Sequence, residues 1–238
     1  MQQLLIITPV KDSIDHTVRT MEAVVQSELD VPHRYVVFND NSTPENTARL
    51  HTEAARLGVE VVDLATLTDH PSPNYLFVLR RCRKEALATD AGLLIVESDV
   101  TVQRDTLQKL FDGATARPNC GIAAAVTVDE EGKINYPYLY ARGKEGQDYD
   151  CKKHCSFCCS LLTPALLKAC DFDRLDDSKN WFDVTISHDS LAAGLHNYLF
   201  CSLPVVHRPH GSRPWKQLKY TNPIKYYWTK WTKGFDKI

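Results

Sequence analysis

The sequence predicts an α/β fold in which a mostly parallel central sheet is covered by helices on both faces. Three observations support this fold class. Short apolar runs alternate with segments of helical periodicity through the first half of the 238-residue chain. These runs are apolar throughout rather than alternating, which is typical of strands buried on both faces. The hydrophobic fraction of 43% and the charged fraction of 24% are those of an ordinary globular protein.

Each expected element follows from a local pattern. Ser13 is a capping residue type, and apolar residues follow it at helical spacing as far as Val25. Pro44 suits the first turn of a helix, and Gly58 suits its C-terminal cap. The expected strands cover residues 4–7, 35–38, 59–62, 92–96, 121–128, 198–200 and 205–206. The expected helices cover residues 14–25, 44–57, 75–88, 103–116, 163–169 and 187–195.

The charge balance and the start of the chain limit the class of protein. With 28 basic and 30 acidic residues the net charge is −2, which excludes a chain-wide polycation, and no nucleic-acid partner is expected. The first residues lack the basic region and cleavage site of a secretory signal, and no apolar run approaches the ~18 residues of a membrane span. We therefore expect a cytoplasmic protein whose eight cysteines are mostly free thiols.

Acidic side chains follow two of the expected strands. Asp40 comes after residues 35–38, and Glu97 and Asp99 come after residues 92–96. Ligands of such sheets bind at the carboxyl ends of the strands, and two acidic groups in one crevice suit a hard cation such as Mg²⁺ or Mn²⁺. The sequence has no glycine-rich dinucleotide motif and no P-loop, so phosphate binding here would be assisted by the metal.

Five segments together resemble the GT-A glycosyltransferases, specifically the inverting, nucleotide-sugar-dependent family two. Residues 6–12 resemble that family's first strand and loop, and residues 37–43 resemble its Val-Asp-Asp-Gly-Ser-Thr segment. The other three segments are residues 95–99 at the place of the Asp-x-Asp metal motif, residues 159–173 at the acceptor-side segment, and residues 188–189 at the Glu-Asp motif. The resemblance extends from about residue 3 to residue 212. It implies a GT-A fold.

The resemblance implies roles for individual residues on the donor side. Asp99 would bind Mn²⁺ or Mg²⁺, and a late histidine would complete the metal shell. Of the two late histidines, His210 fits the family pattern better than His207, and the alternative is a surface-loop histidine without function. The residues that would bind the nucleotide sugar are Thr8, Pro9, Asp40, Arg81, Glu97 and Ser98, with Asp40 at the base. Arg83 is a further candidate, and the alternative for the arginines of residues 80–84 is a solvated basic face.

On the acceptor side, the resemblance implies that Asp189 is the general base. A carboxylate within hydrogen-bond reach deprotonates the acceptor hydroxyl opposite the leaving group. His188 stands where the family has Glu. The alternative for Asp189 is an exposed carboxylate at a helix start, favoured by the helix dipole.

The implied organisation is a GT-A domain over residues 1–212, followed by a basic aromatic segment over residues 213–238. Residues 1–100 would bind the nucleotide sugar and residues 101–212 the acceptor. The implied activity is hexosyl transfer with inversion to a sugar, lipid-linked or protein acceptor, in the synthesis of cell-surface polysaccharide or lipopolysaccharide. A nucleotidyltransferase or a nucleotide-sugar-binding protein on a related fold is the alternative.

The cysteine spacing offers a different function. Cys151, Cys155 and Cys158 have the Cys-x3-Cys-x2-Cys spacing that resembles the iron–sulfur motif of radical SAM enzymes. Only 80 residues follow Cys158, too few for the barrel of that family. Zinc binding, with His154 or Cys159 added, and inert thiols near the acceptor are the other hypotheses for this cluster.

Residues 213–238 contain seven Lys or Arg residues and one Asp, with Trp, Tyr and Phe interleaved. This composition suits an anionic membrane surface. It also suits stacking on single-stranded nucleic acid, or a segment that packs its aromatic side chains on the domain. We expect peripheral attachment to the inner face of the membrane.

Overall fold

A mixed sheet of nine strands forms the centre of the protein. The computed structural model describes residues 1–178, 181–209, 218 and 222–232. Its strand order is β3-β2-β1-β4-β8-β6-β9-β5, and β7 pairs with β9. The strands are β1 (Leu4–Val10), β2 (His33–Asn39), β3 (Glu60–Asp63), β4 (Gly92–Val96), β5 (Val100–Thr101), β6 (Cys120–Val128), β7 (Tyr149–Asp150), β8 (Cys159–Leu162) and β9 (His196–His207). All except β5, β7 and β8 run in the same direction, so the sheet is mostly parallel, as expected.

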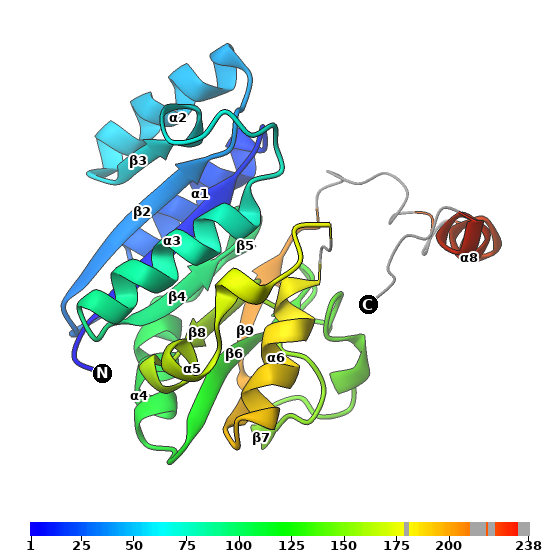
Figure 1. Ribbon diagram of the computed structural model, residues 1–238. Helices are drawn as coiled ribbons and strands as arrows, with labels where there is room; N and C mark the ends of the chain where they lie inside the picture. The colour runs from blue at the N-terminus through cyan, green and yellow to red at the C-terminus, as the bar shows by residue number, and fades with distance from the viewer. Residues whose placement is uncertain (179–180, 210–217, 219–221, 233–238) are drawn as a thin grey trace.

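Helices cover both faces of this sheet (Figure 1). They are α1 (Ile14–Val25), α2 (Pro44–Leu57), α3 (Tyr75–Ala88), α4 (Thr106–Thr115), α5 (Pro164–Ala169), α6 (Phe182–Ala192) and α8 (Pro223–Thr232). Alternate side chains of β1 point to opposite faces. Ile6 packs in a cluster with residues of α1 and α4, whereas Ile7 packs with residues of α3, α5 and α6. A third cluster joins α1 and α2 to β2.

Local signals place several elements where they were expected. The bounds of α3 and β4 are those predicted. Helix α2 begins with Pro44, its N-terminal cap is the Thr43 hydroxyl, and it ends at Gly58, which has φ +69°. This left-handed conformation suits glycine at the end of a helix.

Several elements differ from the prediction. Strands β5 and β8 and helix α8 were not expected, and α4 begins three residues later than expected. Helix α6 begins at Phe182, five residues before the expected start, although Phe, Val, Thr and Ile dominate its first turn and favour strands. Burial of Phe182 and Ile186 in the core outweighs that preference. Strand β9 is continuous over residues 196–207 where two short strands were expected. A register shift opposite Ala125 and Val126 accommodates the residues between the two apolar runs.

The sheet positions a candidate site by joining distant parts of the chain. The parallel strands β1, β2 and β4 bring their carboxyl ends to one edge. The chain continues from β4 through residues 97–99 into β5, which pairs with the end of β9. The same sheet therefore runs through residues 1–100 and residues 101–209. Within the described ranges, no helix combines the length and hydropathy needed to cross a membrane.

Candidate functional site

Segments far apart in the sequence meet at the carboxyl end of β4. The turn after this strand carries Glu97 and Asp99, and the Glu97 amide donates to the Cys158 carbonyl at 2.9 Å. Strand β5 pairs with β9 so that Val100 lies opposite His207. As a result, ligand atoms of Glu97, Cys158 and His207 all lie within 4.8 Å of one another. Asp99 and His207 are only 8% and 5% exposed.

The imidazole of His207 is oriented as a metal ligand would be. Its Nδ1 lies 2.7 Å from the Tyr136 carbonyl, and because a carbonyl only accepts, Nδ1 carries a proton. Its Nε2 lies 3.4 Å from Oδ2 of Asp99. Burial opposes protonation of the ring, but hydrogen bonding and the charges of Asp99 and Glu97 raise its pKa overall. A backbone carbonyl often orients a metal-binding histidine in this way.

Glu97 lies where an uncompensated negative charge is unfavourable. Burial and the Asp99 carboxylate raise the pKa of Glu97 to about 7, although His207 opposes this shift. Sγ of Cys158 donates to Oε2 of Glu97 at 3.2 Å, and burial raises the pKa of this thiol well above its ordinary value. The thiol therefore stays protonated in the metal-free protein, and the hard donors of the group are carboxylate oxygens and one imidazole nitrogen. These donors fit Mn²⁺, and the oxygens also fit Mg²⁺.

Tyr75, the first residue of α3, places an unsatisfied hydroxyl beside this group. Among the described residues its Oη is buried and has no hydrogen-bond partner. Burial raises the pKa of the phenol well above its ordinary value, and the negative charge of Glu97 adds to the shift, so the group stays neutral. A buried hydroxyl without a partner is costly. It is therefore a group that a bound substrate would satisfy.

Asp183, in the first turn of α6, is a carboxylate that the sequence analysis missed. Its charge contributes to the raised pKa values of Glu97 and Tyr75. The Phe182 ring lies 6.3 Å from the Tyr75 ring, between centroids. Farther along α6, Ser187 exchanges hydrogen bonds with the backbone of Cys155, which fixes the helix against the segment leading to Cys158.

The signal for Asp183 in the sequence is weak. Acidic residues are favoured in the first turn of a helix, but that rule identifies Asp183 only when the start of α6 is known. Tyr75 was recognised as a helix start, and nothing in the sequence indicated that its hydroxyl would be buried without a partner.

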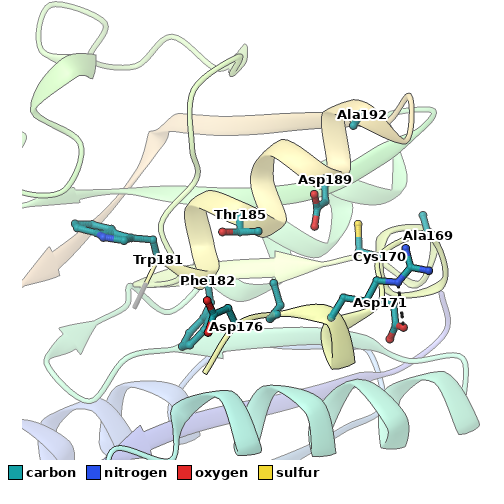
Figure 2. Close-up of a pocket in the computed structure, with 11 residues that line it drawn as sticks. Ala169, Cys170, Asp171, Asp176, Trp181, Phe182, Thr185, Asp189 and Ala192 are labelled. Atoms are coloured by element: carbon teal, nitrogen blue, oxygen red, sulfur yellow. Dashed lines mark ion pairs between the residues drawn. The ribbon is translucent and has the colours of Figure 1, made fainter. Parts of the chain in front are cut away.

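Asp189 lies in a different place from the Glu97–Asp99–His207 group. It projects from α6 toward Cys170 in a cavity of about 580 Å³ between α6 and the segment after α5 (Figure 2). Its charge raises the pKa of Cys170 in addition to the effect of burial. The cavity is lined by Ala169, Cys170, Asp171, Arg174, Leu175, Asp176, Trp181, Phe182, Thr185, Asp189 and Ala192. None of the metal-ligand candidates is among these residues.

Asp40 lies at the end of β2, as expected, and its carboxylate is engaged within the protein. It accepts hydrogen bonds from the Ser72 hydroxyl at 2.7 Å and from the Asn74 amide N–H and side chain, both at 2.8 Å. These bonds hold the residues immediately before α3. In this structure Asp40 therefore helps to position the helix that carries Tyr75.

The other predicted donor-side residues of β1 and the 97–99 turn differ in exposure. Thr8 is buried, and its hydroxyl lies 3.0 Å from the Tyr35 hydroxyl, so its side chain faces the core. Pro9 is partly exposed. Ser98 is buried, with its hydroxyl 3.2 Å from that of Ser13.

The arginines of α3 are not brought to the acidic group. Arg81 is exposed, beside Phe77 and Lys84 on the outer side of the helix. Arg80 donates to the carbonyls of Phe172, Asp173 and Leu175, and Arg83 donates to that of Leu167. Arg80 and Arg83 therefore have a structural role, because they hydrogen-bond α3 to the segment around α5.

The cysteine cluster does not form a metal site of its own. All eight cysteines are unpaired and buried. Among the described residues, which include the whole of 151–159, the one group of three close ligand atoms contains a single cysteine, Cys158. Sγ of Cys151 lies 3.5 Å from the Tyr140 hydroxyl and also contacts the thiol of Cys155. Of the two candidate histidines, His207 lies beside Asp99, and His210 is outside the described residues.

Comparison with known proteins gives matches in structure but not in sequence. No family model matches the chain, and no curated protein matches it by sequence. Mannosyltransferase PcManGT from Pyrobaculum calidifontis, solved with GDP-Man and Mn²⁺, is similar at a TM-score of 0.62 and 14% identity, over 95% of this chain and 63% of that one. S. aureus TarS, solved with UDP-GlcNAc, is similar at a TM-score of 0.61 and 14% identity, over 87% of this chain and 59% of that one. GalNAc-T7, solved with UDP, GalNAc and Mn²⁺, is similar at a TM-score of 0.62 and 11% identity, over 87% of this chain and 44% of that one.

The chain thus spans less than two thirds of the length of each of these proteins. At identities of 11–14%, such similarity establishes the fold and not the substrate. The strand order, the helices on both faces and these structural matches together identify the fold: the chain has the GT-A fold of glycosyltransferases.

Proposed function

We propose that this protein is a metal-dependent glycosyltransferase that moves a sugar from a nucleoside diphosphate to an acceptor hydroxyl. The observation that carries the proposal is the grouping of Glu97, Asp99 and His207 at the carboxyl end of β4. The GT-A fold supports it, because similar structures were solved with GDP-Man, with UDP-GlcNAc, and with UDP, GalNAc and Mn²⁺. We infer a nucleoside-diphosphate hexose as the donor class.

Asp99 and His207 are the proposed ligands of Mn²⁺ or Mg²⁺, with Glu97 beside them. A bound divalent ion would offset the negative charge that develops on the departing nucleoside diphosphate. The carboxylates of Glu97 and Asp99 would in turn lose the mutual repulsion that raises the pKa of Glu97. We propose that the nucleotide base binds near Pro9, in β1, and Asp40, which follows β2.

Asp183 is the proposed general base. An inverting transfer requires one carboxylate that takes the proton of the acceptor hydroxyl. Asp183 acts electrostatically on Glu97 and Tyr75, whereas Asp189 acts on Cys170. Six residues of helix separate the two carboxylates by about 9 Å along the axis and turn them to different sides. This geometry favours Asp183 over Asp189, the base that the family resemblance implied.

Tyr75 is the proposed hydrogen-bond donor to the substrate. Its neutral hydroxyl experiences the negative charges of Glu97 and Asp183 and has no partner among the described residues. A sugar hydroxyl or a phosphate oxygen would accept from it. The acceptor class that we propose is a saccharide, free or lipid-linked, in the synthesis of cell-surface polysaccharide or lipopolysaccharide.

The test is the release of nucleoside diphosphate from a panel of nucleoside-diphosphate sugars, with and without Mn²⁺. Asp183→Asn should lower kcat by about 10²- to 10⁴-fold and leave donor binding intact. Asp189→Asn, the same substitution on the same helix, is the control and should stay within about threefold of the wild type. Release of pyrophosphate from nucleoside triphosphates would instead support a nucleotidyltransferase. Loss of activity in Asp189→Asn but not in Asp183→Asn would reverse the assignment of the base.

A further inference from the structure

Helix α8 exposes a row of large apolar side chains. Ile224, Tyr227, Trp228 and Trp231 are 85%, 59%, 64% and 77% exposed. They occupy positions i, i+3, i+4 and i+7, so they form one face of the helix. The rings of Trp228 and Trp231 lie edge to face, 6.1 Å apart. Figure 1 shows α8 to one side of the sheet and its covering helices.

The opposite side of α8 is covered. At 100° per residue, Tyr226 lies across the helix from the exposed row, and it is 5% exposed. The exposed aromatic face is therefore not the covered side of this helix. Contiguous exposed apolar side chains of this size indicate an interaction surface.

Positive charge flanks this apolar face. Lys225 and Lys230 project about 110° to either side of it by the same helical geometry, and α8 contains no acidic residue. The surrounding sequence, residues 213–238, has seven basic residues and one acidic residue. Lysine stems can extend along an apolar surface while their ammonium groups reach a polar layer.

We propose that α8 binds the surface of an anionic membrane, with its long axis in the plane of the interface. Trp and Tyr have apolar rings with one polar atom, which suits the boundary between lipid headgroups and acyl chains. The flanking lysines are complementary to anionic headgroups. This inference depends on the residues of α8 and does not rest on the proposed catalytic function.

Cosedimentation of the full chain with lipid vesicles tests this inference. The wild type should bind vesicles of phosphatidylcholine mixed with phosphatidylserine, and should bind pure phosphatidylcholine more weakly. Trp228→Ser/Trp231→Ser should weaken binding by at least about tenfold, because it removes the apolar contact. Lys225→Glu/Lys230→Glu should abolish the preference for the anionic vesicles and the sensitivity to salt.

The matched control is Leu67→Ser, which removes an exposed apolar side chain of the domain, 39% exposed, and should bind like the wild type. Circular dichroism and unfolding temperature should be unchanged in every variant. Equal vesicle binding by the wild type and the Trp variant would overturn the proposal. An absence of vesicle binding by the wild type would also overturn it. If the wild type instead forms a dimer in solution and the Trp variant does not, this face binds a second copy of the chain.

Discussion

At the scale of single residues, the site is defined by groups whose surroundings oppose their charge or leave them unsatisfied. Glu97 has a raised pKa, His207 has a fixed proton on Nδ1, and Tyr75 has a buried hydroxyl without a partner among the described residues. Perturbed groups of this kind concentrate at functional sites. The sequence identified Glu97 and Asp99 because acidic residues followed a buried strand. It could not identify Tyr75, since burial of its hydroxyl depends on how α3 packs.

Replacement of Tyr75 by Phe separates function from stability. Because the hydroxyl has no partner in the free protein, Tyr75→Phe should leave the unfolding temperature unchanged or slightly raised. If the hydroxyl donates to the substrate, kcat/KM should fall by about 10- to 100-fold. Thermal unfolding and steady-state kinetics measure the two effects. A lower unfolding temperature with unchanged kcat/KM would contradict the role proposed for this residue.

Glu97 predicts a pH dependence of stability in metal-free protein. The pKa of Glu97 is about 7 in the folded state, against an ordinary value of 4.5. Between pH 4.5 and about pH 7, the folded state therefore keeps a proton on this carboxyl that the unfolded state has lost. The free energy of unfolding should therefore fall as the pH rises through this range. Glu97→Gln should be more stable than the wild type at about pH 8, by about 1–3 kcal/mol, and equally stable near pH 4.

Urea unfolding in the presence of a chelator measures this difference. Added Mn²⁺ should stabilise the wild type more than Glu97→Gln, because the ion compensates the carboxylate. A wild type that gains stability relative to Glu97→Gln as the pH rises would contradict the raised pKa.

At the scale of elements, prediction succeeded where local signals were strong. The start of α2 at Pro44 and its end at Gly58 follow from capping chemistry, and the bounds of α3 and β4 follow from apolar periodicity. It failed at α6, because a first turn rich in strand-forming residues is helical only through burial in the core.

Gly58 gives a prediction at this scale. A Cβ added at this residue would meet nothing within 4 Å, so any cost of substitution comes from its φ of +69°. Gly58→Ala should lower the free energy of unfolding by about 1 kcal/mol, and Gly58→Asn should lower it less, since Asn tolerates the left-handed conformation better. Denaturant titration measures both. If Gly58→Ala is as stable as the wild type, a side chain at this left-handed position costs nothing, and the prediction is wrong.

At the scale of the whole molecule, the site exists because the sheet joins the two ends of the domain. The antiparallel pairing of β5 with β9 brings His207 to within 3.4 Å of Asp99, which precedes it by 108 residues. Sequence analysis placed a histidine in the metal shell by resemblance and preferred His210. The pairing of β9 with β5 places His207 beside Asp99, which local sequence could not indicate, and His210 lies outside the described residues.

The fold class was predictable because strand and helix signals alternate along the chain, and the strand order was not. Strands β8 and β5 insert with opposite direction into an otherwise parallel sheet, which no local pattern indicates. The resemblance to GT-A enzymes supplied the fold as an expectation, and the solved structures of similar fold agree with that fold.

The most direct test of the central claim is the thermal shift of the protein on binding UDP or GDP, with and without Mn²⁺. At ~100 times the dissociation constant the ligand should add about 2.7 kcal/mol of stability, a shift of about 5–10 °C for a chain of this length. The shift should require Mn²⁺, should be lost in Asp99→Asn and His207→Gln, and should persist in His51→Gln, which alters an exposed histidine. An equal shift without Mn²⁺, or an undiminished shift in Asp99→Asn and His207→Gln, would contradict a metal-dependent nucleotide site at the end of β4.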